Sequence, residues 1–290
     1  MLESIPDIFL NTTNREFRVL LAIENSMKFY EWVPKEEIAD FTGYNQKETD
    51  FLLTRLAANK LVQRSNGAYE GYRIYFEAYD LLALNALVSR DSVNAIGEII
   101  GVGKESKVYE VTSGITGRHA IIKFHREGMM SFKKVRIKRE HIEERRHLSW
   151  LYASRLAAKR EFEVLKLLYP QVSVPEPIDH NRHAIVMSVL KGQQLAHARV
   201  DEPGWYLDEI LKQVTKAYQL GIIHADMSEF NVFVNPEGCE IIDWPQYVAA
   251  AHTNAKELLY RDIENILMFF QRKYRIKRDI QGVINNITYA

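Results

Sequence analysis

The sequence has almost no cysteine and no long hydrophobic run. Cys239 is the single cysteine among 290 residues, which excludes an internal disulfide and any zinc site built from cysteines. No apolar run reaches the ~18 residues that a membrane-spanning helix requires. The first residues also lack the basic start of a secretory signal. We therefore expect a cytoplasmic protein without membrane contact.

Net charge is absent as well, because 38 Lys and Arg balance 38 Asp and Glu. This balance argues against a protein that binds nucleic acid with its whole surface, but it is compatible with local basic patches. The hydrophobic fraction of 47% and the charged fraction of 26% are typical of a globular protein. At ~150 residues per domain, the length suggests two domains.

The first 90 residues show the pattern of a winged helix-turn-helix. A helical stripe of apolar residues is followed by a short helix that begins at Pro34, a turn at Gly43 and a second helix over 51–57. Two strands flanking the Asn66-Gly67 turn come next. This order is typical of a winged helix, and a helix over 76–88 would link it to the rest.

A glycine-containing loop lies between two predicted strands. Gly101, Gly103 and Ser106 form a Gly-x-Gly-x-x-Ser pattern. Glycine there allows backbone N–H groups to approach phosphate oxygens, although an ordinary β-turn needs glycine as well. The loop is neither a P-loop nor a dinucleotide fingerprint, because a strand rather than a helix follows it.

A strand and a helix each carry a charged residue that is predicted to face inward. Lys123 ends an apolar strand, on the face of Ile121, and a buried lysine needs an anion. In the helix over 150–169, Glu161 shares the apolar face, whereas Glu163 lies among charged residues. Lys123 and Glu161 would satisfy each other. The alternative is that both side chains reach solvent independently at the rim.

Three polar residues surround a predicted β-hairpin near the end of the chain. Asp226 and Asn231 frame a short loop before it, and Asp243 follows it. If the hairpin is symmetric about Glu237, Asn231 lies opposite Asp243, and directly opposed Cβ atoms are ~4.5–5.5 Å apart. Amide and carboxylate oxygens suit Mg²⁺ that binds substrate phosphates, and Asp226 could accept a proton from a hydroxyl. The alternative is that these residues are only turn and cap residues.

Basic residues gather in several further segments. Residues 126–147 have little apolar pattern, so we expect a mobile basic loop or a frayed helix there. Clusters at 133–139 and 272–278 are candidates for phosphate contacts, and the alternative is that they are simply solvated. In the winged helix, acidic residues outnumber basic ones, although four residues could form one basic face: Lys47, Arg55, Lys60 and Arg64.

Gly-x-Gly, a strand Lys, a helix Glu, His-x-Asp-x-x-x-x-Asn and a later Asp, in this order, form the protein-kinase signature set. The particular forms resemble a RIO-type atypical kinase of the second, winged-helix-bearing subfamily. The resemblance covers essentially the whole chain, and its segments are 101–106, 123–126, 145–150, 161–162, 228–231 and 242–246.

The resemblance implies an α+β fold, in which a winged helix-turn-helix precedes a compact two-lobed kinase-like domain. It gives a winged helix with its linker helix at 1–90, an N-lobe at 91–190 and a C-lobe at 191–290. Domain 191–290 would contain the catalytic and metal-binding loops.

The resemblance also implies ATP with Mg²⁺, or Mn²⁺ in its place. Asp226 would be the catalytic acid/base, Asn231 and Asp243 would bind the metal, and Asp243 could itself become an aspartyl-phosphate, so that the protein would cycle as an ATPase. Lys123 would contact the phosphates and pair with Glu161, and backbone groups after Met187 would meet the adenine. The nucleotide-binding set is Gly101, Gly103, Lys104, Ser106, Lys123, Glu161, Met187, Ser188 and Leu190.

Three positions depart from the ordinary kinase pattern. Ser106 replaces the third glycine of the loop. Ala225 stands where glycine is usual, which should fit only if its backbone avoids positive φ. Asp243-Trp244-Pro245 replaces Asp-Phe-Gly and no Ala-Pro-Glu follows, so the peptide-docking part of ordinary kinases should be missing.

Two other functions compete with this interpretation. A small-molecule phosphotransferase of the aminoglycoside-kinase type shares the His-x-Asp-x-x-x-x-Asn and Ile-Asp-Trp signals, but the winged helix and the glycine loop disfavour it. A non-enzymatic nucleic-acid-binding regulator would use the winged helix alone.

The RIO-type family that the chain resembles works in maturation of the small ribosomal subunit. The resemblance therefore implies the precursor particle and its rRNA as partners, bound through the winged helix and the two basic clusters.

Overall fold

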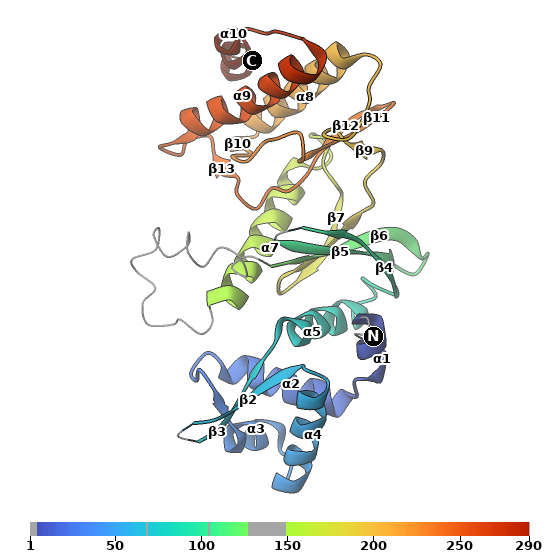
Figure 1. Ribbon diagram of the computed structural model, residues 1–290, viewed down its shortest axis with the longest axis vertical. Coiled ribbons are helices and arrows are strands. Elements are labelled where there is room, and N and C mark those ends of the chain that lie inside the picture. The colour runs from blue at the N-terminus through green and yellow to red at the C-terminus, as the bar shows by residue number, and fades with distance from the viewer. Residues whose placement is uncertain (1–4, 68, 104, 127–148, 290) are drawn as a thin grey trace. The chain divides into compact units, whose positions relative to one another are not determined.

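The computed structural model describes residues 5–67, 69–103, 105–126 and 149–289. The chain divides into two compact units. Figure 1 labels the helices and strands of both. The first comprises Met1–Ala158 and Asp179–Val186, and the second comprises Lys159–Ile178 and Met187–Ala290. Each is described by itself below. Among the described residues, no helix combines the length and the apolar character that crossing a membrane demands.

The first unit begins with the predicted winged helix. Its elements are α1 (Ile5–Asn11), α2 (Asn14–Ser26), β1 (Val33–Pro34), α3 (Lys35–Thr42), α4 (Gln46–Ala58), β2 (Val62–Asn66) and β3 (Glu70–Ile74). The strands form an antiparallel sheet in the order β1-β3-β2. Thr13 and Glu16 cap α2 with a reciprocal capping box, and Gly43 ends α3 in the left-handed region at φ 71°. Of these two signals, the turn at Gly43 is the one on which the sequence prediction depended.

The linker helix and a five-stranded sheet complete the first unit. α5 (Phe76–Val88) has the predicted bounds, and the sheet has the order β4-β5-β6-β8-β7. Its strands are β4 (Ala95–Val102), β5 (Ser106–Ser113), β6 (Arg118–His125), β7 (Pro177–Asn181) and β8 (Ala184–Ser188). The apolar residues of β6 and β8 are almost fully buried, which places this unit's core on the middle of the sheet.

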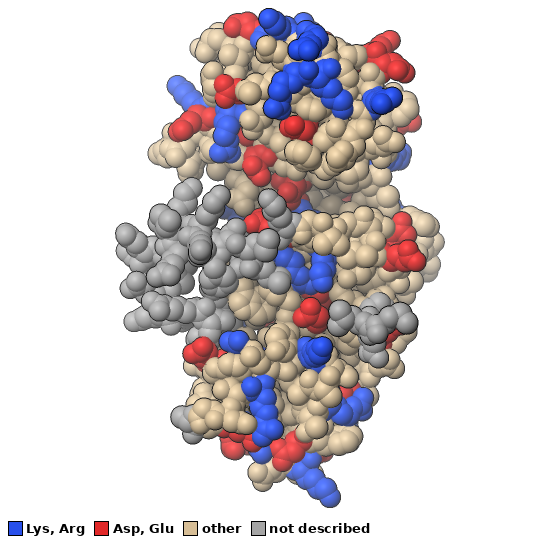
Figure 2. Space-filling view, in the orientation of Figure 1, with Lys and Arg blue, Asp and Glu red and all other residues tan. Residues whose placement is uncertain are grey.

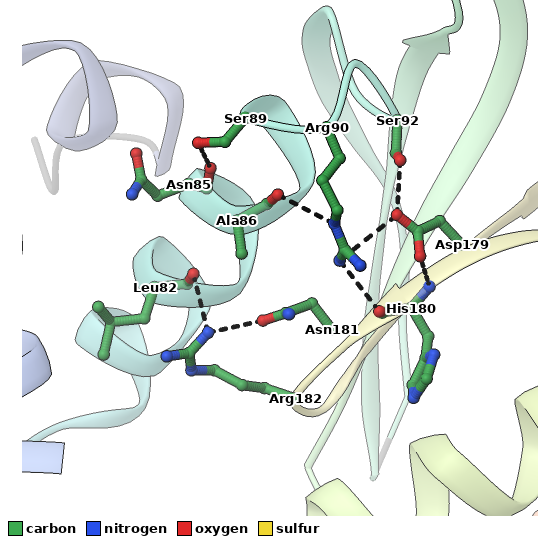
Figure 3. A network of polar contacts seen from close by, with 10 residues as sticks. All are labelled: Leu82, Asn85, Ala86, Ser89, Arg90, Ser92, Asp179, His180, Asn181 and Arg182. Atoms are coloured by element: carbon green, nitrogen blue, oxygen red, sulfur yellow. Dashed lines mark hydrogen bonds and ion pairs between the residues drawn. The ribbon is translucent and has the colours of Figure 1, made fainter. Parts of the chain in front are cut away.

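Polar contacts join α5 to the edge of this sheet (Figure 3). Arg90, just after α5, donates to the carbonyl of His180 at 3.2 Å and forms an ion pair with Asp179 at 3.4 Å. Ser92 donates to the same carboxylate at 2.5 Å. Arg182 donates to the carbonyl of Leu82 within α5 at 3.3 Å. The linker helix and the residues that directly follow it are therefore attached to the β7–β8 hairpin.

The second unit contains the C-terminal elements. They are the second half of α7 (Ser149–Leu168), β9 (Gln193–Gln194), α8 (Pro203–Gln219), β10 (Ile222–Ile223), β11 (Val232–Asn235), β12 (Gly238–Ile241), β13 (Val248–Ala249), α9 (Ala255–Tyr274) and α10 (Ile280–Tyr289). Two small antiparallel sheets have the orders β12-β11-β9 and β10-β13. The helices α7, α8 and α9 agree with the sequence prediction, whereas α10 was not predicted.

Candidate active site

The glycine loop of the first unit is a tight connection between β4 and β5. The N–H of Gly103 donates to the carbonyl of Ser106 at 2.9 Å. A Cβ atom on Gly103 would lie 3.3 Å from the Ser106 hydroxyl, whereas one on Gly101 would meet only ordinary contacts with Val108. Glycine is therefore demanded by close approach at 103 more than at 101. Lys104 lies outside the described residues.

Lys123 is buried, as predicted, although β6 is buried on both faces from Ala120 to His125, so alternation alone does not account for it. Only 9% of its surface is exposed, and it lies opposite Val108 in the β5–β6 ladder. The strand that follows the glycine loop is thus the direct neighbour of the strand that carries the lysine. Arg126, one residue beyond β6, donates its N–H to the carbonyl of Glu105 at 2.6 Å. The chain from the glycine loop into β5 is therefore joined to the lysine strand and its end at two places, Val108 with Lys123 and Glu105 with Arg126.

Arg126 corrects one sequence prediction. We expected a mobile basic segment from residue 126 onward, yet Arg126 is 4% exposed and forms a buried ion pair with Asp80. An isolated buried charge would be costly, and the carboxylate of α5 compensates it. The sequence offered no sign of this partner 46 residues away. The rest of that segment lies outside the described residues.

Glu161 faces inward within the second unit. It is 2% exposed and accepts the N–H of Trp244 at 3.3 Å. Glu163 points outward and pairs with Lys159 at 3.6 Å, so the predicted faces of α7 are confirmed. Arg160 donates to the carbonyls of two residues after Asp243. Helix α7 thus fixes the backbone that follows Asp243. Pairing of Glu161 with Lys123 stays a prediction.

The predicted register of the β11–β12 hairpin is wrong by one residue. Asn235 pairs with Gly238 and Val232 with Ile241, so the turn contains two residues and is not symmetric about Glu237. The side-chain oxygen of Asn235 accepts the N–H groups of Glu237 and Gly238 at 2.8 and 3.1 Å. This Asx-type turn sets the shorter loop. Asn231 is consequently opposite Ile242, not Asp243.

Asn231 and Asp243 nevertheless lie at the same open end of the hairpin. The N–H of Ile242 donates to the carbonyl of Asn231 at 2.9 Å. Asp243 has a left-handed backbone with φ 66°, so the strand alternation ends there and does not decide where its side chain points. The bend of the backbone after Ile242, rather than direct cross-strand pairing, therefore places the carboxylate of Asp243.

The loop over 224–231 is organised by its own polar groups. His224 accepts the N–H of Asp226 through Nδ1 at 3.2 Å, and its Nε2 lies 2.9 Å from the carbonyl of Ile242. Asn231 donates from Nδ2 to the carbonyl of Asp226 at 2.9 Å. The histidine links the loop to the strand before Asp243. The asparagine uses its NH₂ group internally, which leaves Oδ1 as the ligand atom it can offer.

Ala225 does not behave as the sequence analysis expected. Its φ is 65°, in the left-handed region that we expected alanine to avoid, and it is 7% exposed. A non-glycine residue there costs ~1–2 kcal/mol, so surrounding contacts must maintain it. The N–H of Ala225 donates to Asp262 at 2.6 Å, and its carbonyl accepts from Arg261.

Asp262 is the main residue that sequence reasoning missed. It lies on the buried face of α9, is 2% exposed, and accepts the N–H groups of Ala225 and Met227 at 2.6 and 3.0 Å. Asn265, one turn on, donates to the Met227 carbonyl at 3.0 Å. An acid among the apolar positions Leu259, Ile263 and Ile266 is the signal that could have revealed it.

The electrostatics of the loop fit proton transfer beside a second carboxylate. Partial desolvation raises the pKa of Asp226 above its ordinary value, His224 opposes this, and the negative charge of Asp243 adds to it. Carboxylate oxygens of Asp243 and the amide oxygen of Asn231 are hard donors that suit Mg²⁺ rather than Zn²⁺.

The segment after β8 is partly engaged in the fold. Met187 is 4% exposed. The N–H of Ser188 donates to the carbonyl of Glu176 at 3.0 Å, and its hydroxyl accepts the N–H of Glu176 at 2.9 Å. Ser188 can therefore offer a planar base its carbonyl rather than its N–H. The predicted roles of Ser188 and Leu190 stay predictions.

The C-terminal basic cluster is less uniform than its sequence suggests. Lys273 donates to the carbonyls of Leu195, Ala196 and Ala198 at 2.8–3.4 Å. Arg278 forms an ion pair with Asp208 at 3.4 Å. Within the described residues, no ion pair engages the exposed Arg275 or Lys277. Figure 2 shows Lys and Arg side chains gathered over the C-terminal helices. The 133–139 cluster lies outside the described residues.

Ion pairs also engage half of the proposed basic face of the winged helix. Arg55 pairs with the buried Glu16 at 3.3 Å, and Arg64 pairs with Glu70 at 2.8 Å. Lys47 and Lys60 are exposed. The face therefore presents less unpaired positive charge than its sequence suggests.

The fold and the loops define the class as a protein-kinase-like phosphoryl-transfer domain preceded by a winged helix. Residues 107–283 match the RIO domain family, and residues 9–90 match the Rio2 N-terminal family. The chain is 41% identical over 266 residues to the RIO-type serine/threonine-protein kinase Rio2 of Methanocaldococcus jannaschii, covering 89% of this chain and 96% of that protein. It is 36% identical over 269 residues to the Schizosaccharomyces pombe serine/threonine-protein kinase rio2, covering 91% and 78%.

Solved structures agree with these matches. The crystal structure of a Rio2 kinase-ADP/Mg²⁺-phosphoaspartate complex from Chaetomium thermophilum has a TM-score of 0.84 and 31% identity, and the match covers 98% of this chain and 89% of that one. The chain belongs to the Rio2 family of RIO-type serine/threonine-protein kinases. This membership confirms the predicted fold and enzyme class, and it disfavours both alternatives considered above.

Proposed function

We propose that this chain transfers the γ-phosphoryl group of ATP and that Asp243 is its first acceptor. The arrangement of the loop around Asp226 and the segment around Asp243 carries the proposal: His224 contacts the carbonyl of Ile242, and Asn231 donates to the carbonyl of Asp226. A Chaetomium thermophilum relative forms a complex with ADP, Mg²⁺ and phosphoaspartate, which supports the same chemistry here. The cycle would make the protein an ATPase as well as a kinase.

Transfer to Asp243 exchanges one phosphorus–oxygen bond for another. A carboxylate oxygen of Asp243 forms a bond to the γ-phosphorus, the bond from that phosphorus to the β–γ bridging oxygen breaks, and ADP leaves. Water then hydrolyses the acyl phosphate. Bound Mg²⁺ would supply charge neutralisation on the phosphates, with Asn231 and Asp243 as its protein ligands. Lys123 would bind phosphate oxygens, and Asp226 would accept a proton from an attacking hydroxyl or water.

Labelling with γ-labelled ATP and Mg²⁺ tests this proposal. An acyl phosphate is cleaved by hydroxylamine, whereas phosphoserine is stable to it. We expect hydroxylamine-labile label on the wild type and on Glu237→Ala, a control in the exposed turn of the same hairpin. We expect none on Asp243→Ala. Only stable label, or labile label that persists in Asp243→Ala, would overturn the aspartyl-phosphate.

We further propose the precursor of the small ribosomal subunit as the partner. The exposed Arg275 and Lys277 and the exposed lysines of the winged helix support contacts to rRNA phosphates. The phosphoryl acceptor would lie in that particle. The protein would act on it in the cytoplasm.

A further inference from the structure

A buried ion pair connects the linker helix with the nucleotide-binding elements of the first unit. Asp80 of α5 is completely buried, and Arg126 approaches its carboxylate with two nitrogens, one of them at 2.6 Å. His183 of the β7–β8 hairpin contacts the same carboxylate through Nε2 at 2.7 Å. One acid of α5 thus binds side chains from two different parts of the sheet.

The backbone of Arg126 extends this connection to the glycine loop. Its N–H donates to the carbonyl of Glu105, which directly precedes Ser106. The residue before it, His125, pairs with Ser106 in the ladder and donates its N–H to the carbonyl of His183. Lys123 lies on the same strand as His125, two residues before it. The side chain of Arg126 therefore anchors the backbone from which both loop and lysine are positioned.

Aromatic packing makes this connection rigid. The guanidinium of Arg126 lies 4.6 Å from the ring centroid of Phe76, the first residue of α5. Tyr79 of the same helix stacks on His183, with centroids 4.4 Å apart and an interplanar angle of 18°. The charged and aromatic side chains of α5 fix the rotamers of Arg126 and His183. A small displacement of α5 therefore cannot be absorbed by side-chain motion alone.

We propose that Asp80 is a positioning residue for nucleotide binding: through Arg126, it fixes the end of the glycine loop and the strand that carries Lys123. The inference rests on the proposed ATP-binding function.

The outer contacts of α5 provide a matched control. Asp179 pairs with Arg90 and Ser92 (Figure 3) and joins α5 to the same sheet. Neither of these contacts touches β6 or the glycine loop. Asp179→Asn should therefore weaken the attachment of α5 without changing nucleotide affinity by more than about twofold. A general effect of loosening α5 would appear equally in this variant.

The test variant is Asp80→Asn combined with Arg126→Met. Asp80→Asn alone would strand a buried guanidinium and could prevent folding, whereas removing both charges is often tolerated. In calorimetry with ADP and Mg²⁺ on the full chain, we expect about tenfold or greater loss of affinity, which is ~1.4 kcal/mol. Circular dichroism and a cooperative melt establish that the variant is folded. A folded double variant with wild-type affinity would overturn the proposal.

Hydrogen exchange of the nucleotide-free wild type provides a second measurement that needs no variant. The Arg126 amide reports on the bond to Glu105, and we expect its protection to equal that of the α5 core amides. Exchange of Arg126 more than about a hundredfold faster than the α5 core would show that α5 does not hold the loop, and would overturn the proposal. If the wild type binds no ADP, the proposed function fails, while this exchange comparison still decides the positioning role.

Discussion

At the scale of single residues, two backbone positions carry strain beside the reacting groups. Ala225 and Asp243 both have positive φ, 65° and 66°, and each flanks a predicted functional carboxylate or is one. Nothing in local propensity would place them there. The hydrogen bonds of Asp262 to the loop and of Glu161 to Trp244 maintain these conformations. The strain is thus maintained by helices α9 and α7 and is located where the side chains must be aimed.

His183 provides a pH prediction at the same scale. Burial lowers its pKa from 6.5 to about 4. Below pH 6.5 the unfolded imidazole binds a proton that the folded one does not, so stability falls as pH decreases toward 4. The full difference amounts to ~3 kcal/mol. We expect the free energy of unfolding, measured in urea, to decline over this window in the wild type.

The matched variants isolate this histidine. His183→Gln should be less stable at pH 7 but should lose less stability between pH 6.5 and 4. His252→Gln, which replaces an exposed histidine, should retain the wild-type slope. An unchanged slope in His183→Gln would show that other groups control the acid sensitivity. Burial raises the pKa of Asp80, but Arg126 and His183 lower it by more, so the net shift is downward. Asp80 therefore adds its own loss of stability only at still lower pH.

At the scale of elements, α9 is the scaffold of the catalytic loop. Two backbone N–H groups of the loop donate to Asp262, and two loop carbonyls accept from Arg261 and Asn265. These groups are otherwise buried, and each buried donor without an acceptor costs ~1–3 kcal/mol. The helix therefore replaces the regular secondary structure that the loop lacks.

Removing the acid of α9 should disturb both stability and chemistry. Asp262→Ala leaves the N–H groups of Ala225 and Met227 without acceptors, so we expect a loss of ~2–5 kcal/mol in the free energy of unfolding and a large loss of autophosphorylation. Glu257→Ala, an exposed position on the same helix, should change neither by a measurable amount. Chemical denaturation and labelling with ATP check both variants. A stable, active Asp262→Ala would exclude the scaffold role.

The β11–β12 hairpin was predictable in outline but not in register. Strands, turn and the proximity of its polar ends were predictable from alternation and from Pro236 and Gly238. Register was not, because it depends on whether the Asn235 side chain closes a two-residue turn. A shift of one residue reverses which side chains share a face. Here the left-handed Asp243 ends the regular strand, so the polar cluster does not depend on the predicted facing.

In the whole molecule the numbers of positive and negative side chains are equal, but only some of the cations are engaged by partners within the protein. Lysines and arginines equal aspartates and glutamates in number, so any rRNA affinity must come from those cations that internal partners do not engage. In the C-terminal cluster, Lys273 is committed to three carbonyls. Arg275 and Lys277 are the candidates for phosphate contacts among the described residues of that cluster.

Charge reversal tests this distribution. Arg275→Glu with Lys277→Glu should weaken RNA binding and reduce its dependence on salt, because fewer counterions are released. ADP affinity should be unchanged. The control Lys256→Glu reverses an exposed charge on α9 outside the cluster. Unchanged RNA binding by the double variant, measured by filter binding across a salt series, would exclude this cluster as an rRNA contact.

Four features follow from the amino-acid sequence alone: the order of elements, the winged helix, the burial of Lys123 and Glu161, and the set of polar residues at 226–243. These features depend on local spacing and on periodicity, which a sequence displays directly. Tertiary structure decided the partners of buried charges, such as Asp80 with Arg126 and Asp262 with the loop. It also imposed positive φ on Ala225 and Asp243. Such features arise only when distant segments pack together, since no local propensity favours a buried charge or a left-handed alanine.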